Sequence, residues 1–211
     1  MESAEPHVRV PAGAVIALAV SILEKVGLPT LDARDVADAL TRADLRGVET
    51  HGMRKLVSYV DQLRNGRLNP RPNITVVHES PVSAVVDGDG GMGAVVGVRA
   101  MDLCISKALN HGLCAVAVRR SSHFGMASHY ALRCLPFDLI GLSLSNNAGT
   151  AIVPTYGITG MLATNPISIV APAGQEAPFE LDFATSVVPM NKIGMMLNQG
   201  LKTIPLGWAL D

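Results

Sequence analysis

The sequence has little charge and few aromatic side chains. Only 17% of its 211 residues are charged and 4% are aromatic, and the formal net charge is −1. Nucleic-acid-binding proteins carry clustered Lys and Arg, so this near-neutral balance argues against that class. Hydrophobic residues make up 48% of the chain, whereas disordered chains combine low hydrophobicity with high net charge. We therefore expect a folded protein that handles a small molecule and binds no nucleic acid.

Long hydrophobic runs and paired cysteines are also missing. The longest apolar run, residues 12–23, is shorter than the roughly 20 residues that span a bilayer, and no signal-peptide cleavage site follows it. The three cysteines, Cys104, Cys114 and Cys134, form no C-x-x-C pair. No histidine lies in H-E-x-x-H or forms a metal-binding motif with a cysteine. We expect a cytoplasmic protein with reduced thiols, no membrane contact and no metal site.

The first third of the chain has a helical pattern. Apolar residues recur at spacings of three and four over residues 11–26, 30–47 and 53–63. Pro70 and Pro72 then interrupt any helix. The sequence predicts a helical N-terminal domain over residues 1–72 and a second domain over 73–211.

The second part alternates short apolar runs with helical segments. Strands are predicted at residues 74–77, 82–86, 112–118, 139–144, 167–171 and 179–181, and helices at 94–110, 126–135 and 187–198. Interleaved strands and helices predict an α/β or α+β domain.

A glycine motif, Gly88-x-Gly90-x-x-Gly93, follows a predicted strand and precedes a predicted helix. This is the spacing of a dinucleotide-binding loop. However, Asp87 and Asp89 place carboxylates where phosphates would lie. Arg119-Arg120, at the end of the next strand, is consistent with binding a 2′-phosphate or with a solvated strand end. The motif is thus either a cofactor loop of a Rossmann protein that uses NADP or a structural turn.

Two of the six histidines lie at predicted ends of helices and strands. His51 follows Thr50, and His123 follows Ser122. Loops at such ends often present catalytic side chains, and imidazole exchanges protons near neutral pH. Taken singly, each histidine is more typical of a loop or capping role; the segments described next favour a catalytic role for the two together.

Hydroxyl and amide side chains are concentrated in residues 162–166 and 181–186, followed by Lys192. Such groups supply hydrogen bonds for phosphate, ribose or carboxamide. Thr185 and Ser186 are also suited to cap the helix predicted from residue 187.

Five segments, taken in order, resemble one family. Residues 43–52, 122–131, 164–166, 182–186 and 204–211 are similar to segments of the malate/L-lactate dehydrogenase family of non-Rossmann oxidoreductases, which includes ureidoglycolate and sulfolactate dehydrogenases. The resemblance implies an NAD- or NADP-dependent homodimer that exchanges hydride with a small 2-hydroxy acid or 2-oxo acid. It also implies a mixed-sheet cofactor domain in which the glycine motif is a turn.

The resemblance implies roles for individual residues as well. It assigns acid/base catalysis to His51 or His123, with the other histidine bonding the substrate. A cation near Thr50, either Arg54 or Lys55, would bind the substrate carboxylate; the family tends to have Arg where this chain has Lys55. The implied cofactor-binding residues are Ser122, Gly125, Thr164, Asn165, Pro166, Asp182, Ala184, Thr185, Ser186 and Lys192.

Family members continue beyond the segment that resembles residues 204–211. We therefore expect this chain to be the front part of a longer enzyme. The alternative is a truncated, non-catalytic remnant or an assembly partner of such an enzyme. The choice between NAD and NADP stays open.

Overall fold

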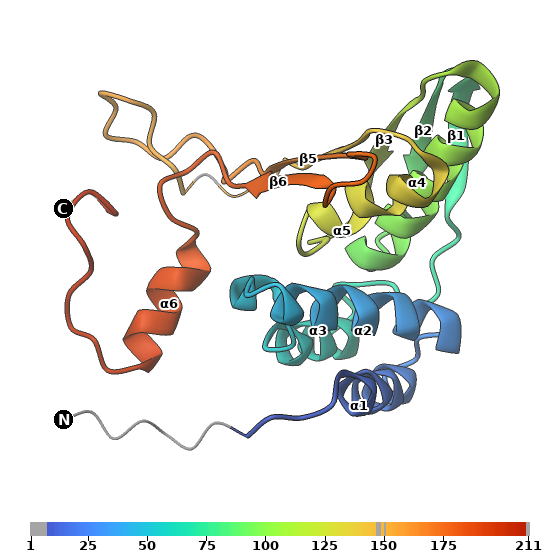
Figure 1. Ribbon diagram of the computed structural model, residues 1–211. Helices are drawn as coiled ribbons and strands as arrows, with labels where there is room; N and C mark the ends of the chain where they lie inside the picture. Colours follow the sequence, from blue (N-terminus) through green and yellow to red (C-terminus); the bar gives the residue numbers. More distant parts are fainter. Residues whose placement is uncertain (1–7, 147–148, 150, 210–211) are drawn as a thin grey trace.

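The computed structural model describes residues 8–146, 149 and 151–209. Three helices form the first layer: α1 (Ala12–Lys25), α2 (Thr30–Leu45) and α3 (Lys55–Arg64), with the short 3₁₀ helix η1 (Glu49–His51) between the last two. In the view of Figure 1 they lie below the helices and strands of residues 75–131 (α4, α5 and the strands β1, β2 and β3). Gly27, with φ of 103°, lets the chain leave α1 in a conformation that other residues rarely adopt. The predicted helical pattern is confirmed.

The first sheet has the strand order β1-β2-β3. Strands β1 (Thr75–Ser80) and β2 (Ser83–Asp87) are antiparallel, with a bulge between Val76 and His78. Helix α4 (Gly93–His111) then crosses over and β3 (Ala115–Arg119) pairs parallel with β2. A parallel pair needs such a crossover, which the alternating sequence pattern predicted.

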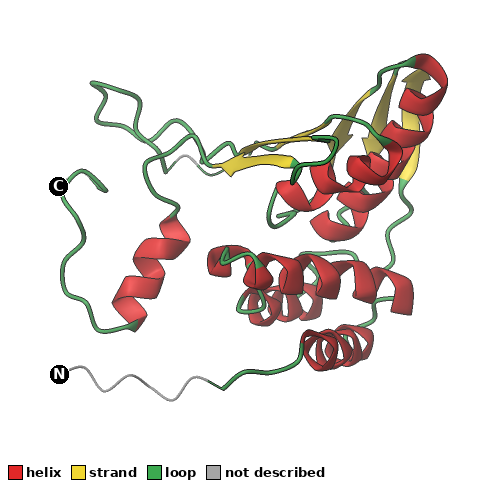
Figure 2. Ribbon diagram, in the orientation of Figure 1, coloured by secondary structure: helices red, strands yellow, loops and turns green. Residues whose placement is uncertain are grey.

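The second sheet is antiparallel, with the order β4-β5-β6. It contains β4 (Gly141–Leu144), β5 (Ile167–Ala171) and β6 (Phe179–Phe183). Figure 2 shows strands of this sheet running above the three N-terminal helices, with one end next to α5 (Ser128–Ala131). Two small sheets with packed helices make the mixed α/β fold that the sequence predicts.

Two sequence predictions need correction. Residues 126–135 do not form one α-helix: α5 (Ser128–Ala131) gives way to the 3₁₀ helix η2 (Leu132–Phe137), because Pro136 removes a donor that an α-helix requires. The last helix, α6 (Met190–Asn198), begins after Pro189 and has no side-chain cap. Thr185 and Ser186 therefore do not cap it.

One hydrophobic core joins the helical layer to the start of α4. Leu23, Leu40 and Leu63 pack in the same buried cluster as Met92 and Val95. We propose residue 72 as the boundary between the two domains, and residues from both sides of it contribute to this core. None of the helices among residues 8–146, 149 and 151–209 combines the length and hydrophobicity needed to cross a membrane.

Candidate active site

His51 and His123 lie face to face. Their ring centroids are 5.4 Å apart and the ring planes differ by 18°. Thr50 Oγ1 lies 2.8 Å from His51 Nδ1, and Tyr59 Oη lies 2.7 Å from His123 Nδ1. Each histidine thus has a hydroxyl partner at Nδ1, which leaves Nε2 for other contacts.

Sequence reasoning missed Tyr59. Its side chain is buried and projects from α3. It stands four residues after Lys55, and residues four apart share one helix face. That spacing is the only signal in the sequence that places it near the site.

Gly52 fixes the loop that carries His51. The Met53 amide donates to Asp44 Oδ2 over 2.8 Å. A Cβ at Gly52 would lie 1.6 Å from Asp44 Oδ1, so no other residue fits without moving this carboxylate. Asp44 and Gly52 together hold the chain tightly just after the histidine.

Gly93 positions the loop that carries His123. A Cβ at Gly93 would lie 2.4 Å from the carbonyl oxygens of both Ser122 and His123. The Gly93 amide donates to Ser122 Oγ over 2.8 Å, and this hydroxyl donates to the Gly91 carbonyl over 3.2 Å. The last glycine of the motif therefore allows α4 to approach the histidine loop.

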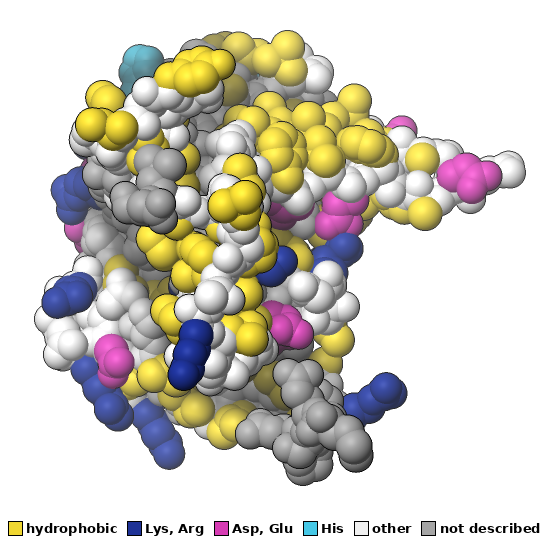
Figure 3. All heavy atoms as spheres, turned by 90° about the vertical axis from the view of Figure 1, so that its left-hand side faces the viewer, with side chains coloured by type: hydrophobic (Ala, Val, Ile, Leu, Met, Phe, Trp, Pro, Cys, Tyr) yellow, Lys and Arg dark blue, Asp and Glu magenta, His cyan; other side chains and the backbone are white. Residues whose placement is uncertain are grey.

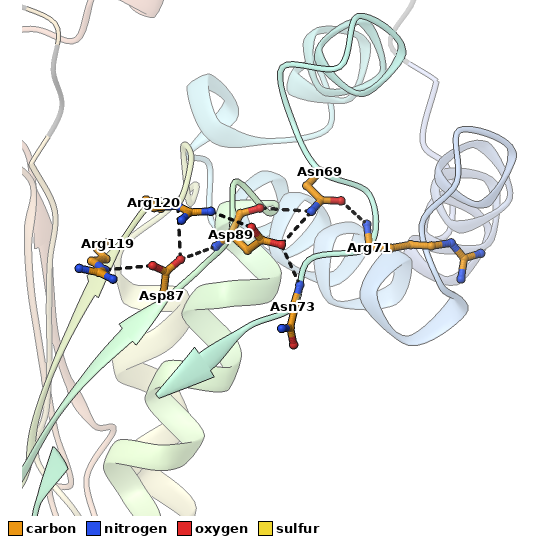
Figure 4. A network of polar contacts seen from close by, with 7 residues as sticks. All are labelled: Asn69, Arg71, Asn73, Asp87, Asp89, Arg119 and Arg120. Carbon is orange, nitrogen blue, oxygen red and sulfur yellow. Dashed lines mark hydrogen bonds and ion pairs between the residues drawn. The ribbon is translucent and has the colours of Figure 1, made fainter. Parts of the chain in front are cut away.

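In the rest of the glycine motif, the two aspartate side chains of the loop bond to neighbouring protein groups (Figure 4). The Asp89 amide donates to Asp87 Oδ1 over 2.9 Å, which is the main reason why the pKa of Asp87 lies below its usual value. Arg119 Nε donates to Asp87 Oδ2 over 3.0 Å, and Arg120 donates to Asp89 Oδ1 over 2.7 Å. Asp89 Oδ2 also accepts from Asn69 and from the Asn73 amide, each over 3.0 Å. These contacts favour the turn over a phosphate-binding loop.

Burial sets the protonation of both histidines. His123 is partly exposed to solvent. The protein atoms around its ring nevertheless disfavour the imidazolium and, with the charges of His51 and Lys55, lower its pKa to about 4. Burial and Lys55 also lower the pKa of His51, whereas Asp182 raises it. Both imidazoles are therefore neutral near pH 7.

The two candidate cations differ in their surroundings. Lys55 is half-buried, and burial followed by the charge of Arg54 lowers its pKa. Its charge reaches both histidines. Arg54 is exposed. Of the two, Lys55 is the cation coupled to the histidine pair.

A cavity of about 730 Å³ opens beside the histidine pair. His51, His123 and the candidates Ser122, Gly125, Thr164 and Pro166 all line it. A second cavity of about 320 Å³ is lined by Thr164, Met190 and Trp208. Thr164 therefore borders both cavities.

Hydrogen bonds join the remaining candidate segments to this region. The Thr185 amide and Oγ1 both donate to the Thr164 carbonyl, over 2.9 and 3.0 Å. Asp182 Oδ2 accepts from the Ser128 amide over 2.7 Å. Asn191 Nδ2 donates to the Thr50 carbonyl over 3.5 Å. The last of these contacts links α6 to the residue before His51.

Four other candidate residues line neither cavity. Lys192 Nζ lies 5.6 Å from the centroid of the Trp208 ring, next to the second cavity. Asn165 has φ of 37°, and its buried Oδ1 has no partner within the described part of the chain. Ser186 Oγ donates to the Val188 carbonyl over 3.2 Å, and Ala184 is half-buried but lines neither cavity.

Comparisons with known proteins agree on one family. A family model described as "Malate/L-lactate dehydrogenase" matches residues 10–211. The malate dehydrogenase of Pyrococcus horikoshii is 45% identical over 207 residues, which are 98% of this chain and 57% of the relative. The L-sulfolactate dehydrogenase of Methanocaldococcus jannaschii is 42% identical over 194 residues, covering 92% and 56%. The chain spans a little over half the length of these curated relatives.

Solved structures give the same result. The P. horikoshii OT3 malate dehydrogenase matches with a TM-score of 0.85 and 46% identity, over 88% of this chain and 53% of that chain. The M. jannaschii sulfolactate dehydrogenase matches with a TM-score of 0.87 and 40% identity, over 95% and 57%. The chain belongs to the malate/L-lactate dehydrogenase family.

Proposed function

We propose that this chain carries the proton-transfer half of an oxidoreductase site that interconverts a small 2-hydroxy acid and its 2-oxo acid with NAD or NADP. The observation that carries the proposal is the pair of stacked histidines, 5.4 Å apart, on the wall of a cavity of about 730 Å³. Relatives are named for malate and L-sulfolactate, which are both 2-hydroxy acids.

His51 is the proposed proton acceptor. A neutral imidazole takes up a hydroxyl proton, and the nearby carboxylate of Asp182, which raises the pKa of His51, stabilises the imidazolium that forms. His123 has the lower pKa, of about 4. It therefore stays neutral and bonds the substrate oxygen through Nε2, while Tyr59 holds Nδ1.

Lys55 is the proposed site for the substrate carboxylate. Burial strengthens a charge-assisted hydrogen bond by excluding water, and Lys55 is the half-buried cation beside both histidines. A lysine binds a carboxylate through a compact charge and lacks the two-pronged geometry of arginine. We therefore expect Lys55 to contribute affinity and Arg54 to act mainly through Lys55.

The residues present fit a nicotinamide dinucleotide. Gly125 has φ of 81°, and nothing lies within 4 Å of the Cβ position, so the backbone is open to a ligand there. Asn165 offers a buried oxygen that has no partner among the described residues, and Thr164 borders both cavities. Lys192 supplies a cation for phosphate beside the second cavity.

The chemistry that such a cofactor supplies when bound is acceptance or donation of hydride at C4 of its nicotinamide ring. The proposed binding set consists of Ser122, Gly125, Thr164, Asn165, Pro166, Asp182, Ala184, Thr185, Ser186 and Lys192. Because its hydroxyl is already bonded to Gly93 and Gly91, Ser122 contributes mainly by shaping the cavity wall.

Fluorescence titration of NADH and NADPH, followed by turnover assays on malate, lactate and sulfolactate, tests the proposal. The chain is assayed alone and co-expressed with the part of the P. horikoshii enzyme that lies outside the match. We expect His51→Gln to abolish turnover and to leave cofactor binding within about twofold, with exposed His78→Gln as the control. Cofactor binding without any turnover would favour the alternative of a non-catalytic assembly partner. Absence of both would refute the proposal.

We further propose that the protein works in the cytoplasm as a homodimer. Cys104, Cys114 and Cys134 are free thiols, which suits a reducing compartment. Fractionation of the source cells and sedimentation of the purified protein test the two parts separately.

A further inference from the structure

The carboxylate of Asp89 binds two segments that are far apart in the sequence. Hydrophobic side chains gather over much of the face shown in Figure 3, where charged side chains are spread out. The polar residues of Figure 4 instead form one connected network around Asp89. Asp89 Oδ1 accepts a hydrogen bond from Arg120 over 2.7 Å, and Oδ2 accepts from the Asn69 side chain and the Asn73 amide, each over 3.0 Å. One side chain therefore joins the segment of Asn69 and Asn73 to that of Arg120.

The first of these segments connects the helical layer to the first sheet. It runs from α3 to β1 and contains residue 72, the proposed domain boundary. Leu68, near its start, is buried in the same core cluster as the three helices. The Asn69 amide also donates to the Gly90 carbonyl over 2.9 Å. Backbone and side-chain contacts thus both hold this connection against the turn that contains Asp89.

The second segment leads from β3 to His123. Arg120 is the first residue after β3 and has a left-handed conformation, with φ of 51°. The Gly90 amide donates to the Arg120 carbonyl over 2.8 Å, while the guanidinium pairs with Asp89. The turn around Asp89 therefore holds both the backbone and the side chain of Arg120, three residues before the histidine.

The two histidines lie on opposite sides of this connection. His51 belongs to η1, between α2 and α3, whereas His123 belongs to the loop after β3. Their rings stack, and His123 Nδ1 contacts Tyr59 of α3. Stacking requires the loop after β3 to keep its place against the helical layer. Such placement matters for a reaction, because a displacement of about 1 Å lowers a rate by roughly 100-fold.

We propose that Asp89 is a positioning residue, which holds His123 over His51 by joining the connection between the domains to the chain that leads to His123. Asp89 lines neither cavity, so it acts through the histidine. Its effect on catalysis rests on the proposed function, whereas its effect on the position of the rings does not.

Two substitutions separate the carboxylate from the backbone turn. Asp89 has φ of 49°, a conformation that glycine and asparagine also adopt. Asp89→Gly removes all three side-chain contacts, and Asp89→Asn removes the charge and one of the two acceptors. The matched control is Asp138→Gly, because Asp138 is exposed and has a similar φ of 55°. Thermal unfolding checks each variant, and Asp89→Asn decides the question if Asp89→Gly does not fold.

NMR of the ring C–H signals in the 211-residue chain reports the position of the rings without any turnover. We expect both Asp89 variants to move the signals of His51 and His123 toward those of unstacked imidazole. The pKa of His123, which burial and the charges of His51 and Lys55 lower to about 4, should rise. Asp138→Gly should change neither property. A purely stabilising role of Asp89 would change the unfolding temperature and leave the ring signals of the folded chain as they are.

Turnover then measures the effect on the reaction, in the chain co-expressed with the part of the P. horikoshii enzyme that lies outside the match. We expect both Asp89 variants to lower kcat at least tenfold. KM for the 2-hydroxy acid should stay within about threefold, because Lys55, the proposed carboxylate ligand, keeps its place. A parent enzyme without turnover would refute the proposed function, and the ring signals would still decide the positioning.

Three results would overturn the proposal. The first is that the ring signals and the pKa of His123 in both Asp89 variants match those of the parent. The second is that Asp138→Gly changes them equally, since the effect would then not depend on the contacts of Asp89. The third is that the rings move while kcat is unchanged, which would show that this positioning does not serve the reaction.

Discussion

The His51 and His123 rings lie stacked with centroids 5.4 Å apart, although they belong to a 3₁₀ turn and to a separate loop after β3. A proton on one ring disfavours a proton on the other, because like charges repel at this distance. The pair therefore accepts one proton more readily than two.

Replacing Lys55 should change the titration of both rings. Its positive charge lowers the pKa of His51 and of His123, so Lys55→Met should raise both pKa values. NMR titration of the ring C–H signals measures this. Arg54→Met is the control, and an equal shift in that variant would show that the effect is not specific to Lys55.

Tyr59→Phe should leave His123 Nδ1 without its partner at 2.7 Å. We expect the free energy of unfolding to fall by about 1 kcal/mol and the ring tautomer of His123 to change in ¹⁵N NMR spectra. Tyr156→Phe, at an exposed position, should do neither. An unchanged His123 spectrum in Tyr59→Phe would show that the hydrogen bond does not set the tautomer.

Gly93→Ala should destabilise the fold and displace the His123 loop. The new Cβ would lie 2.4 Å from two backbone carbonyl oxygens, and overpacking of this kind costs about 1–3 kcal/mol. Gly194→Ala, in α6 with open space around it, should instead be neutral or stabilising. Urea denaturation compares the two, and equal stabilities would contradict the proposed close approach.

Acid should destabilise the protein through His129. Its ring nitrogens are buried without hydrogen-bond partners in the described structure, and burial, together with Arg42 and Arg133, lowers its pKa to about 4. The unfolded chain takes up this proton near pH 6.5 and the folded chain does not. The contribution of His129 to stability is therefore full above pH 6.5 and falls by about 3 kcal/mol as the pH drops to 4. His129→Phe should flatten this part of the stability curve, whereas His78→Gln should not.

Arg120→Gln should not change the preference between NADPH and NADH. Its guanidinium is already paired with Asp89 over 2.7 Å (Figure 4). Lys192→Gln should weaken the binding of both cofactors by several-fold, since it removes the cation beside the second cavity. Selective loss of NADPH binding in Arg120→Gln would restore the reading of the glycine motif as an NADP loop.

The sequence by itself determined the element order and most boundaries. Apolar spacing, together with Gly27 and Pro70, marks the three helices, and β5 occupies the same residues, Ile167–Ala171, that its pattern predicts. These features depend on local periodicity and backbone preference, which a single sequence displays. Two boundaries differ from the pattern, and both lie at prolines. Helix α6 begins only after Pro189, and the helix after α5 has 3₁₀ geometry and contains Pro136. Apolar spacing alone does not show these effects of proline.

Only the tertiary structure decided which side chains meet. Tyr59 hydrogen-bonds to His123, and the charge of Lys55 lowers the pKa of both histidines. Asp89, inside the glycine motif, pairs with Arg120. These contacts connect residues that are distant along the chain, and nothing in local spacing encodes the close packing that brings them together. The family segments marked the histidines as candidates, but their neutral state follows from the surrounding protein atoms and from the charge of Lys55, which come together only once the chain has folded.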